Sequence, residues 1–206
     1  MLDKMVEKAR KGLVNVKEFA AGEHEISVSE ERLNRMAKED ETVRKKLDEA
    51  GVDDVELAVE DEGIVVRGRF RKKGVSGGFQ VRMKPGEPIW EEDRHAIRLN
   101  IVDQDVDFDR NVSGLLAGLG SKVASGLFGW DVVGGRIREE TEGGVVTLDL
   151  DGHGRMLDTV LTSIRATRLE CRPGRVVFAF KPDGSHAMSN ARELLTWWKE
   201  RKEGKG

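Results

Sequence analysis

The stretch VELAVEDEGIVVRGRFR, residues 55–71, decides the fold because its apolar side chains recur at every second position. A period of two is the pattern of a β-strand with one buried face and one solvated face. The apolar residues alternate with acids before the turn and with arginines after it; they are Val55, Leu57, Val59, Ile64, Val66 and Phe70. An acidic turn ending in Gly63 joins the two runs. The stretch therefore predicts an antiparallel hairpin.

The same period continues after this hairpin. Residues 79–84 alternate in the same way and add a third strand to an antiparallel meander. The apolar residues of 97–101 and those of 106–108 lie in opposite phases, which predicts a β-bulge near residues 101–102. Two more hairpins are predicted, over residues 132–150 and 169–180.

Helical periodicity marks both ends of the chain. Residues 2–20 and 29–50 carry apolar side chains at helical spacing. Ser27 and Glu30 resemble a capping box for the second helix, and Gly51 supplies its end. A short helix is predicted near residues 156–164, and a C-terminal amphipathic helix over residues 187–203.

These elements predict an α+β fold with an antiparallel sheet. A chain of 206 residues fits one domain, spanning 1–206, and no low-complexity linker divides it. Its parts are a helical region over 1–50, a sheet region over 52–182 with an apolar helix inserted at 112–130, and the C-terminal helix.

Composition limits the cellular setting and the partners. The net charge of −3 argues against a general nucleic-acid binder, which carries a strong basic excess. A single cysteine, Cys171, rules out an internal disulfide and fits a reducing compartment. The N-terminus has no signal-peptide pattern, and no apolar run reaches the length of a membrane span. We therefore expect a cytoplasmic protein.

Residues 112–130, VSGLLAGLGSKVASGLFGW, form the most informative segment for function. As a helix they place an apolar stripe beside a stripe of small residues, which allow a close approach to a partner surface. One interpretation is a mobile gate over an apolar cavity, and the other is a core helix packed on the sheet. The candidate groove or gate residues are Leu115, Leu116, Leu119, Val123, Leu127, Phe128 and Trp130.

A basic face accompanies the meander. Its arginines alternate with the apolar residues and so share the polar side of the sheet. This face fits contact with anionic headgroups at a membrane surface, and it equally fits an ordinary solvated face that protects an edge. The candidate headgroup contacts are Arg67, Arg69, Arg71 and Arg82.

The sequence contains no catalytic or metal-binding motif that we recognise. Asp103, Asp105, Asp107 and Asp109 alternate along one strand face, but the pattern of a calcium loop fails. The four histidines lack metal-ligand spacing, and no nucleophile elbow, phosphate loop or dinucleotide fingerprint is present. We expect no metal, no cofactor and no enzymatic activity.

Three stretches resemble bacterial TULIP-like lipid-binding proteins, including the LmeA-like phospholipid-binding family. They are ISVSEERLN at 26–34, the hairpin at 55–68 and LECRPGRVVFAF at 169–180. The resemblance covers about residues 24–182 and is one of pattern. It implies a curled antiparallel sheet wrapped around helices, with an apolar groove for acyl chains and no enzymatic activity. Such proteins are usually exported or anchored in the envelope, whereas no export signal is visible here.

The sequence thus predicts binding of a lipid or another apolar small molecule. The alternative is a cytoplasmic interaction or scaffold protein, in which the amphipathic helices bury against a partner or a second copy of the chain. A third interpretation, a metal- or His-dependent hydrolase, rests on isolated residues such as His153 near Asp151.

Overall fold

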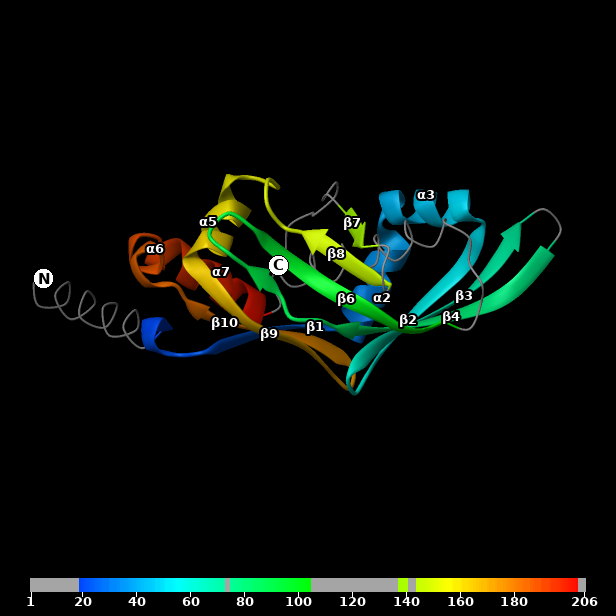
Figure 1. The fold of residues 1–206 in the computed structure, drawn as a ribbon, viewed down its shortest axis with the longest axis horizontal. Coiled ribbons are helices and arrows are strands. Elements are labelled where there is room, and N and C mark those ends of the chain that lie inside the picture. Colours follow the sequence, from blue (N-terminus) through cyan, green and yellow to red (C-terminus); the bar gives the residue numbers. More distant parts are fainter. Residues whose placement is uncertain (1–18, 73–74, 105–136, 141–143, 204–206) are drawn as a thin grey trace, which may run out of the picture.

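The computed structural model describes residues 19–72, 75–104, 137–140 and 144–203 and has an α+β fold (Figure 1). All strand pairings are antiparallel. The strands are β1 (His24–Ser29), β2 (Val52–Glu60), β3 (Gly63–Lys72), β4 (Val75–Pro85), β5 (Ile89–Trp90), β6 (His95–Gln104), β7 (Ile137–Glu140), β8 (Val145–Asp149), β9 (Ile164–Arg172) and β10 (Arg175–Pro182). The helices are α2 (Glu30–Glu39), α3 (Glu41–Ala50), α5 (Arg155–Ser163), α6 (Gly184–Ser189) and α7 (Ala191–Lys202).

The larger sheet has seven strands in the order β2-β3-β4-β6-β8-β7, and β5 pairs with β6. Its first three strands are the predicted meander, and the apolar positions that alternate along β2 are buried. β7 and β8 form the predicted hairpin, with Ile137 opposite Leu148. Period-two reasoning therefore predicted β2, β3, β4, β6, β7 and β8, whereas the two-residue strand β5 was not predicted.

The predicted bulge in β6 is confirmed at Val102. Met83 of β4 lies opposite Ile101, but the next residue of β4, Arg82, lies opposite Asp103. Val102 is the extra residue, and its side chain is 49% exposed. A bulge reverses the phase of the following side chains, as the pattern of apolar residues required.

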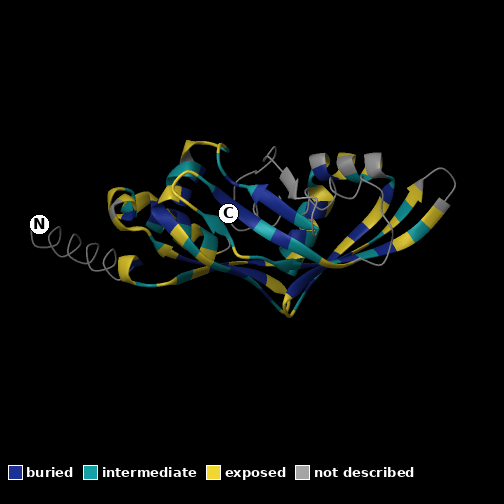
Figure 2. Ribbon diagram, viewed as in Figure 1, coloured by how far each residue is buried: buried dark blue, intermediate teal, exposed yellow. Residues whose placement is uncertain are grey.

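The smaller sheet has three strands in the order β1-β10-β9. Phe178 and Phe180 of β10 are fully buried and stack at a centroid distance of 5.9 Å. They belong to one continuous core, which also contains residues from the larger sheet, α2, α5 and α7. Figure 2 shows the buried residues running through the middle of the molecule, while the distal ends of β3 and β4 carry exposed ones.

The single helix predicted over residues 29–50 is wrong: the chain forms two helices that meet at Asp40. Asp40 ends α2, and its carboxylate accepts the main-chain N–H of Val43 at 3.0 Å, so it also caps the start of α3. The predicted cap at Ser27 is also wrong, because β1 continues to Ser29 and that residue caps α2 instead. Gly51 ends α3 in the left-handed conformation, as predicted.

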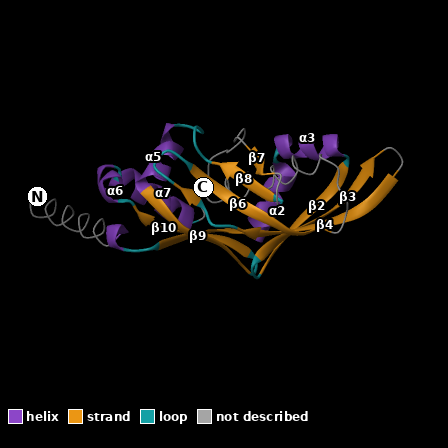
Figure 3. Cartoon of the chain, viewed as in Figure 1, coloured by secondary structure: helices purple, strands orange, loops and turns teal. Residues whose placement is uncertain are grey.

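The C-terminal helix is likewise divided, at Asn190, into α6 and α7. The Asn190 side-chain amide donates to Ser163 Oγ at 3.0 Å, which ties the break to the end of α5. Trp197 is buried in the core, and Trp198 is half-buried. Figure 3 shows α5, α6 and α7 gathered at one end of the elongated molecule, with α3 lying toward the other.

Side chains of α2 close the outer edge of β2. The Asn34 amide donates to the Leu57 carbonyl at 2.7 Å and accepts the Leu57 N–H at 2.9 Å, as a neighbouring strand would. One turn earlier, Glu30 accepts the Val59 N–H at 2.7 Å. The Val59 carbonyl accepts the N–H of Gly174, at the turn between β9 and β10, at 2.8 Å. This edge therefore offers no free main-chain groups at residues 57 and 59.

Two predicted helices lie outside the described residues. They are the first helix, except for its last residues, and the apolar segment 112–130. None of the helices in the described ranges is both long enough and apolar enough to cross a membrane.

Candidate functional site

A groove runs along β1 where α2 and α7 approach the strand. It consists of two adjoining hollows with volumes of about 540 and 380 Å³, and Glu25, Ile26, Ser27 and Lys202 line both. We call the two hollows together the basic groove, because cationic lining residues outnumber acidic ones. The cationic residues are Arg32, Arg35, Arg172, Arg175, Arg201 and Lys202, and the acids are Glu23 and Glu25.

The local sequence of each element explains why its polar side chains face this groove. Ile26 and Val28 of β1 are buried, so the alternation of the strand leaves Ser27 and Ser29 exposed. In α2, Arg32 and Arg35 are three residues apart and share one side of the helix. The basic residues of α7 fall in its last turn, where cations favour the helix dipole.

The carboxylate of Glu25, which lines both hollows, is already engaged by arginines. Arg172 donates two hydrogen bonds to it, of 3.0 Å and 2.9 Å, and Arg168 donates a third. The hydrogen bonds from Arg172 hold the pKa of Glu25 below its usual value, with Arg168 adding to the effect. Glu25 therefore remains ionised, and its charge is already engaged by Arg172 and Arg168.

Arg201 carries the clearest electrostatic signal in the groove. Its Nε and Nη1 atoms are buried, and no described residue accepts a hydrogen bond from them. Partial burial lowers the pKa of Arg201, the nearby charge of Arg32 lowers it further, and the charge of Glu200 opposes part of this shift. An arginine stays protonated in proteins even so. The buried Nε and Nη1 donors therefore lack the hydrogen-bond acceptor that such groups require.

Trp198 lies one helical turn before Arg201 and lines the second hollow. Its indole Nε1 is also buried without an acceptor in the described part of the chain. The Lys202 ammonium lies 5.0 Å from the centroid of the Trp198 ring, within the range of a cation–π contact. This side of α7 thus presents two unsatisfied donors and a second cation together.

The four arginines predicted to contact headgroups lie elsewhere, on β3 and β4, and most of them are paired. Arg82 and Arg67 lie 2.9 and 3.7 Å from the Glu60 carboxylate. Arg71 lies 3.4 Å from Asp53. Arg69 is exposed and has no ion pair with a described residue. Two carboxylates, Glu60 and Asp53, therefore offset part of the charge of this face, and its contact with headgroups stays a prediction.

The predicted groove or gate residues of 112–130 lie outside the described residues, and so do three of the four alternating aspartates, Asp105, Asp107 and Asp109. These residues therefore have no described position relative to the basic groove. Among the residues that it does describe, no group of three or more His, Cys, Asp or Glu side chains could hold a metal ion.

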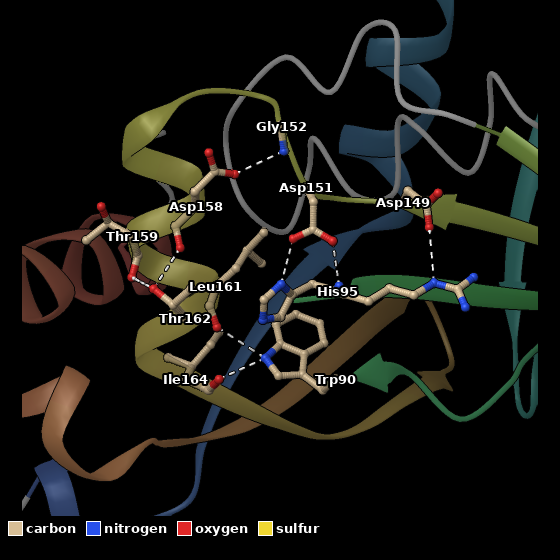
Figure 4. Close-up of polar contacts among 11 residues, drawn as sticks. Trp90, His95, Asp149, Asp151, Gly152, Asp158, Thr159, Leu161, Thr162 and Ile164 are labelled. Carbon is tan, nitrogen blue, oxygen red and sulfur yellow. Dashed lines mark hydrogen bonds and ion pairs between the residues drawn. The ribbon is translucent and has the colours of Figure 1, made fainter. Parts of the chain in front are cut away.

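The buried His95 and the partly exposed Asp151 form a polar pair beside α5 (Figure 4). The His95 ring Nδ1 lies 2.6 Å from Asp151, and the His95 main-chain N–H donates to the same carboxylate at 2.6 Å. The Trp90 indole packs edge-on to His95 and donates to the carbonyls of Leu161 and Ile164. These bonds clamp β5 and β6 to α5.

The hydroxyls of Thr159 and Thr162, on the neighbouring helix, donate to main-chain carbonyls of α5. Within the described part of the chain, no hydroxyl or thiol makes a hydrogen bond with the His95 ring. Burial, with the nearby charge of Glu170, raises the pKa of the Cys171 thiol to about 12, which keeps it unreactive at neutral pH.

Sequence reasoning did not identify the residues of the basic groove. Arg32 and Arg201 lie on helices far apart in the chain, and charged residues on amphipathic helices normally face solvent. A usable signal was the unusual placement of Arg201 three residues after Trp198, in register with a half-buried helix face. This placement indicates that Arg201 is partly buried, but it does not indicate which groups lie beside it.

Comparisons of the chain with protein-family models, with curated proteins and with solved structures gave no match.

Proposed function

We propose that the protein is a binding protein, not an enzyme, and that it holds an anionic ligand in the basic groove. The observation that carries this proposal is Arg201, whose buried Nε and Nη1 atoms have no acceptor among the described residues. Donor atoms that are buried without an acceptor destabilise a fold. Such atoms are best explained by a ligand that supplies the missing acceptor oxygens.

The chemistry of the lining favours carboxylate or phosphate oxygens. Arginine offers a planar fork of donors that matches both groups. The Ser29 side chain caps the start of α2, and the positive end of this helix dipole adds to the field near Arg32. The larger hollow, of about 540 Å³, has the size of a small-molecule site.

Titration calorimetry with inorganic phosphate and with glutarate, at constant ionic strength, tests the proposal. We expect binding to the wild type and a loss of at least about tenfold in Arg201→Gln, since one charge-assisted hydrogen bond contributes about 1.5–3 kcal/mol. Arg155→Gln is the matched control, because it removes the same charge from an exposed side chain that does not line the groove. Equal binding by both variants, or no binding of either anion by the wild type, would contradict the proposal.

Binding of a lipid or another apolar ligand is a second candidate. It is favoured by the apolar sequence of residues 112–130 and by the resemblance of residues 24–182 to lipid-binding proteins, with a curled sheet around helices and an apolar groove. The basic groove and an apolar groove are compatible in one protein, as the two ends of an amphiphile require different surroundings.

A charge at Leu119 separates a gate from a core helix. If the segment is a gate, Leu119→Glu should fold normally by circular dichroism and lose uptake of a fluorescent fatty acid, since a mobile gate can turn the carboxylate to water. If the segment is a core helix, the buried charge costs several kcal/mol and the variant unfolds. An unfolded variant, together with a wild type that never takes up the probe, would reject the lipid proposal.

A further inference from the structure

The outer edge strands of the two sheets differ in whether their main-chain groups are hydrogen-bonded within the described chain. An edge strand carries a row of unpaired N–H and C=O groups that can pair with another chain. At β2 this row is closed at residues 57 and 59 by Asn34, Glu30 and Gly174. β1 is also an edge strand, because in the described sheet it pairs with β10 alone.

The outer edge of β1 is open within the described chain. Its residues pair with β10 in an unbroken register from His24 opposite Phe180 to Ser29 opposite Arg175. Apart from this ladder, the main chain of residues 24–28 makes no hydrogen bond with any described residue, whereas Ser29 leads into α2 as its N-cap. The strand, HEISVS, contains no proline, lysine or bulge of the kind that protects an edge.

The basic groove follows this open edge. One hollow is lined by residues 23–27 and the other by residues 25–27 and 29, so together they extend along the whole strand. Six residues of strand span about 20 Å. A single small anion would fill one part of such a groove, whereas an extended chain would fill its length.

Charge determines which extended chain would fit. The groove presents Arg32, Arg35 and Lys202 in addition to the unsatisfied Arg201. Its carboxylate Glu25 is occupied by Arg168 and Arg172. An incoming strand with acidic side chains would meet these cations, and a basic strand would be repelled.

We propose that the ligand is an acidic, extended segment of a partner protein, which adds to the smaller sheet as a fourth strand beside β1. This inference rests on the proposed function and names the ligand of the same groove. Main-chain hydrogen bonds to β1 supply the pairing, and the arginines select acidic side chains.

A peptide with alternating Asp and Val residues, seven residues long and blocked at both ends, is the probe, with binding followed by fluorescence anisotropy. Two versions carry N-methyl groups, one on the Asp amides and one on the Val amides. Only one edge of an added strand faces β1, so one methylated peptide should lose at least about tenfold in affinity. The other should stay within about twofold of the parent. A version with Ser in place of Asp should bind at least about tenfold more weakly. Arg201→Gln should weaken binding of the parent peptide, whereas Arg155→Gln, at an exposed residue that does not line the groove, should not.

The outcomes separate this inference from the proposed function. If the two methylated peptides bind alike, whether as well as the parent or as poorly as each other, strand addition is rejected. If the parent peptide does not bind but phosphate or glutarate does, strand addition is rejected and anion binding stands. If neither the peptide nor these anions bind, both proposals fail.

Discussion

Arg201 is the residue where stability and binding should oppose each other. In the free protein its buried donors have no described acceptor. Replacement of such a charge by an apolar side chain of similar length often stabilises a fold. We therefore expect Arg201→Met to raise the free energy of unfolding in urea while anion binding is lost. A lower unfolding free energy would mean that Arg201 has a structural partner.

Cys171 should resist thiol reagents until the protein unfolds. With a pKa of about 12, set by burial and by Glu170, about one thiol in 10⁴ is ionised at pH 8. Reaction with Ellman's reagent at this pH should be slow in the native protein and fast in guanidinium. Fast labelling without denaturant would contradict the burial of this side chain.

The raised pKa of Cys171 should also make the free energy of unfolding fall at alkaline pH. The thiol ionises near 9 in the unfolded chain and near 12 in the folded one, so the folded state holds more protons between these values. Stability should therefore fall as the pH rises above 9. Cys171→Ala should show a smaller fall than the wild type in urea titrations at pH 8 and pH 10.

Among the elements, α2 stabilises the molecule through Asn34 as well as through its apolar side. Asn34→Ala leaves both the N–H and the carbonyl of Leu57 without a partner, and we expect a loss of about 2–4 kcal/mol. Asn34→Asp keeps the acceptor and loses the donor, so its loss should be intermediate. Urea denaturation measures both, and a loss below about 0.5 kcal/mol for Asn34→Ala would show that the edge of β2 is satisfied by water instead.

The elements also show how far the sequence predicts this fold. Strands with one apolar face were predictable, because each alternation is local; the phase change that located the bulge at Val102 is an example. The break at Asp40 was missed, since the apolar stripe continues across it and only the cap geometry reveals it. The groove could not be predicted, because it needs β1, α2 and α7 together, and their order in space depends on the pairing of β1 with β10.

At the scale of the whole molecule, the two sheets share one continuous core. We therefore expect a single cooperative unfolding transition. Tryptophan fluorescence, to which three of the four tryptophans, Trp90, Trp197 and Trp198 near the smaller sheet, contribute, should give the same urea midpoint as circular dichroism of the strands. Two separate midpoints would show that the meander unfolds independently of β1, β9 and β10.

Because β1 pairs with β10, the smaller sheet cannot form during synthesis until β10 has been made. Ser29 lies opposite Arg175, so a strand made early waits for one made 146 residues later. At about 5–20 residues per second, the ribosome needs roughly 7–30 s to supply that partner. During this interval both edges of β1 are unpaired, and the nascent chain is open to misassociation.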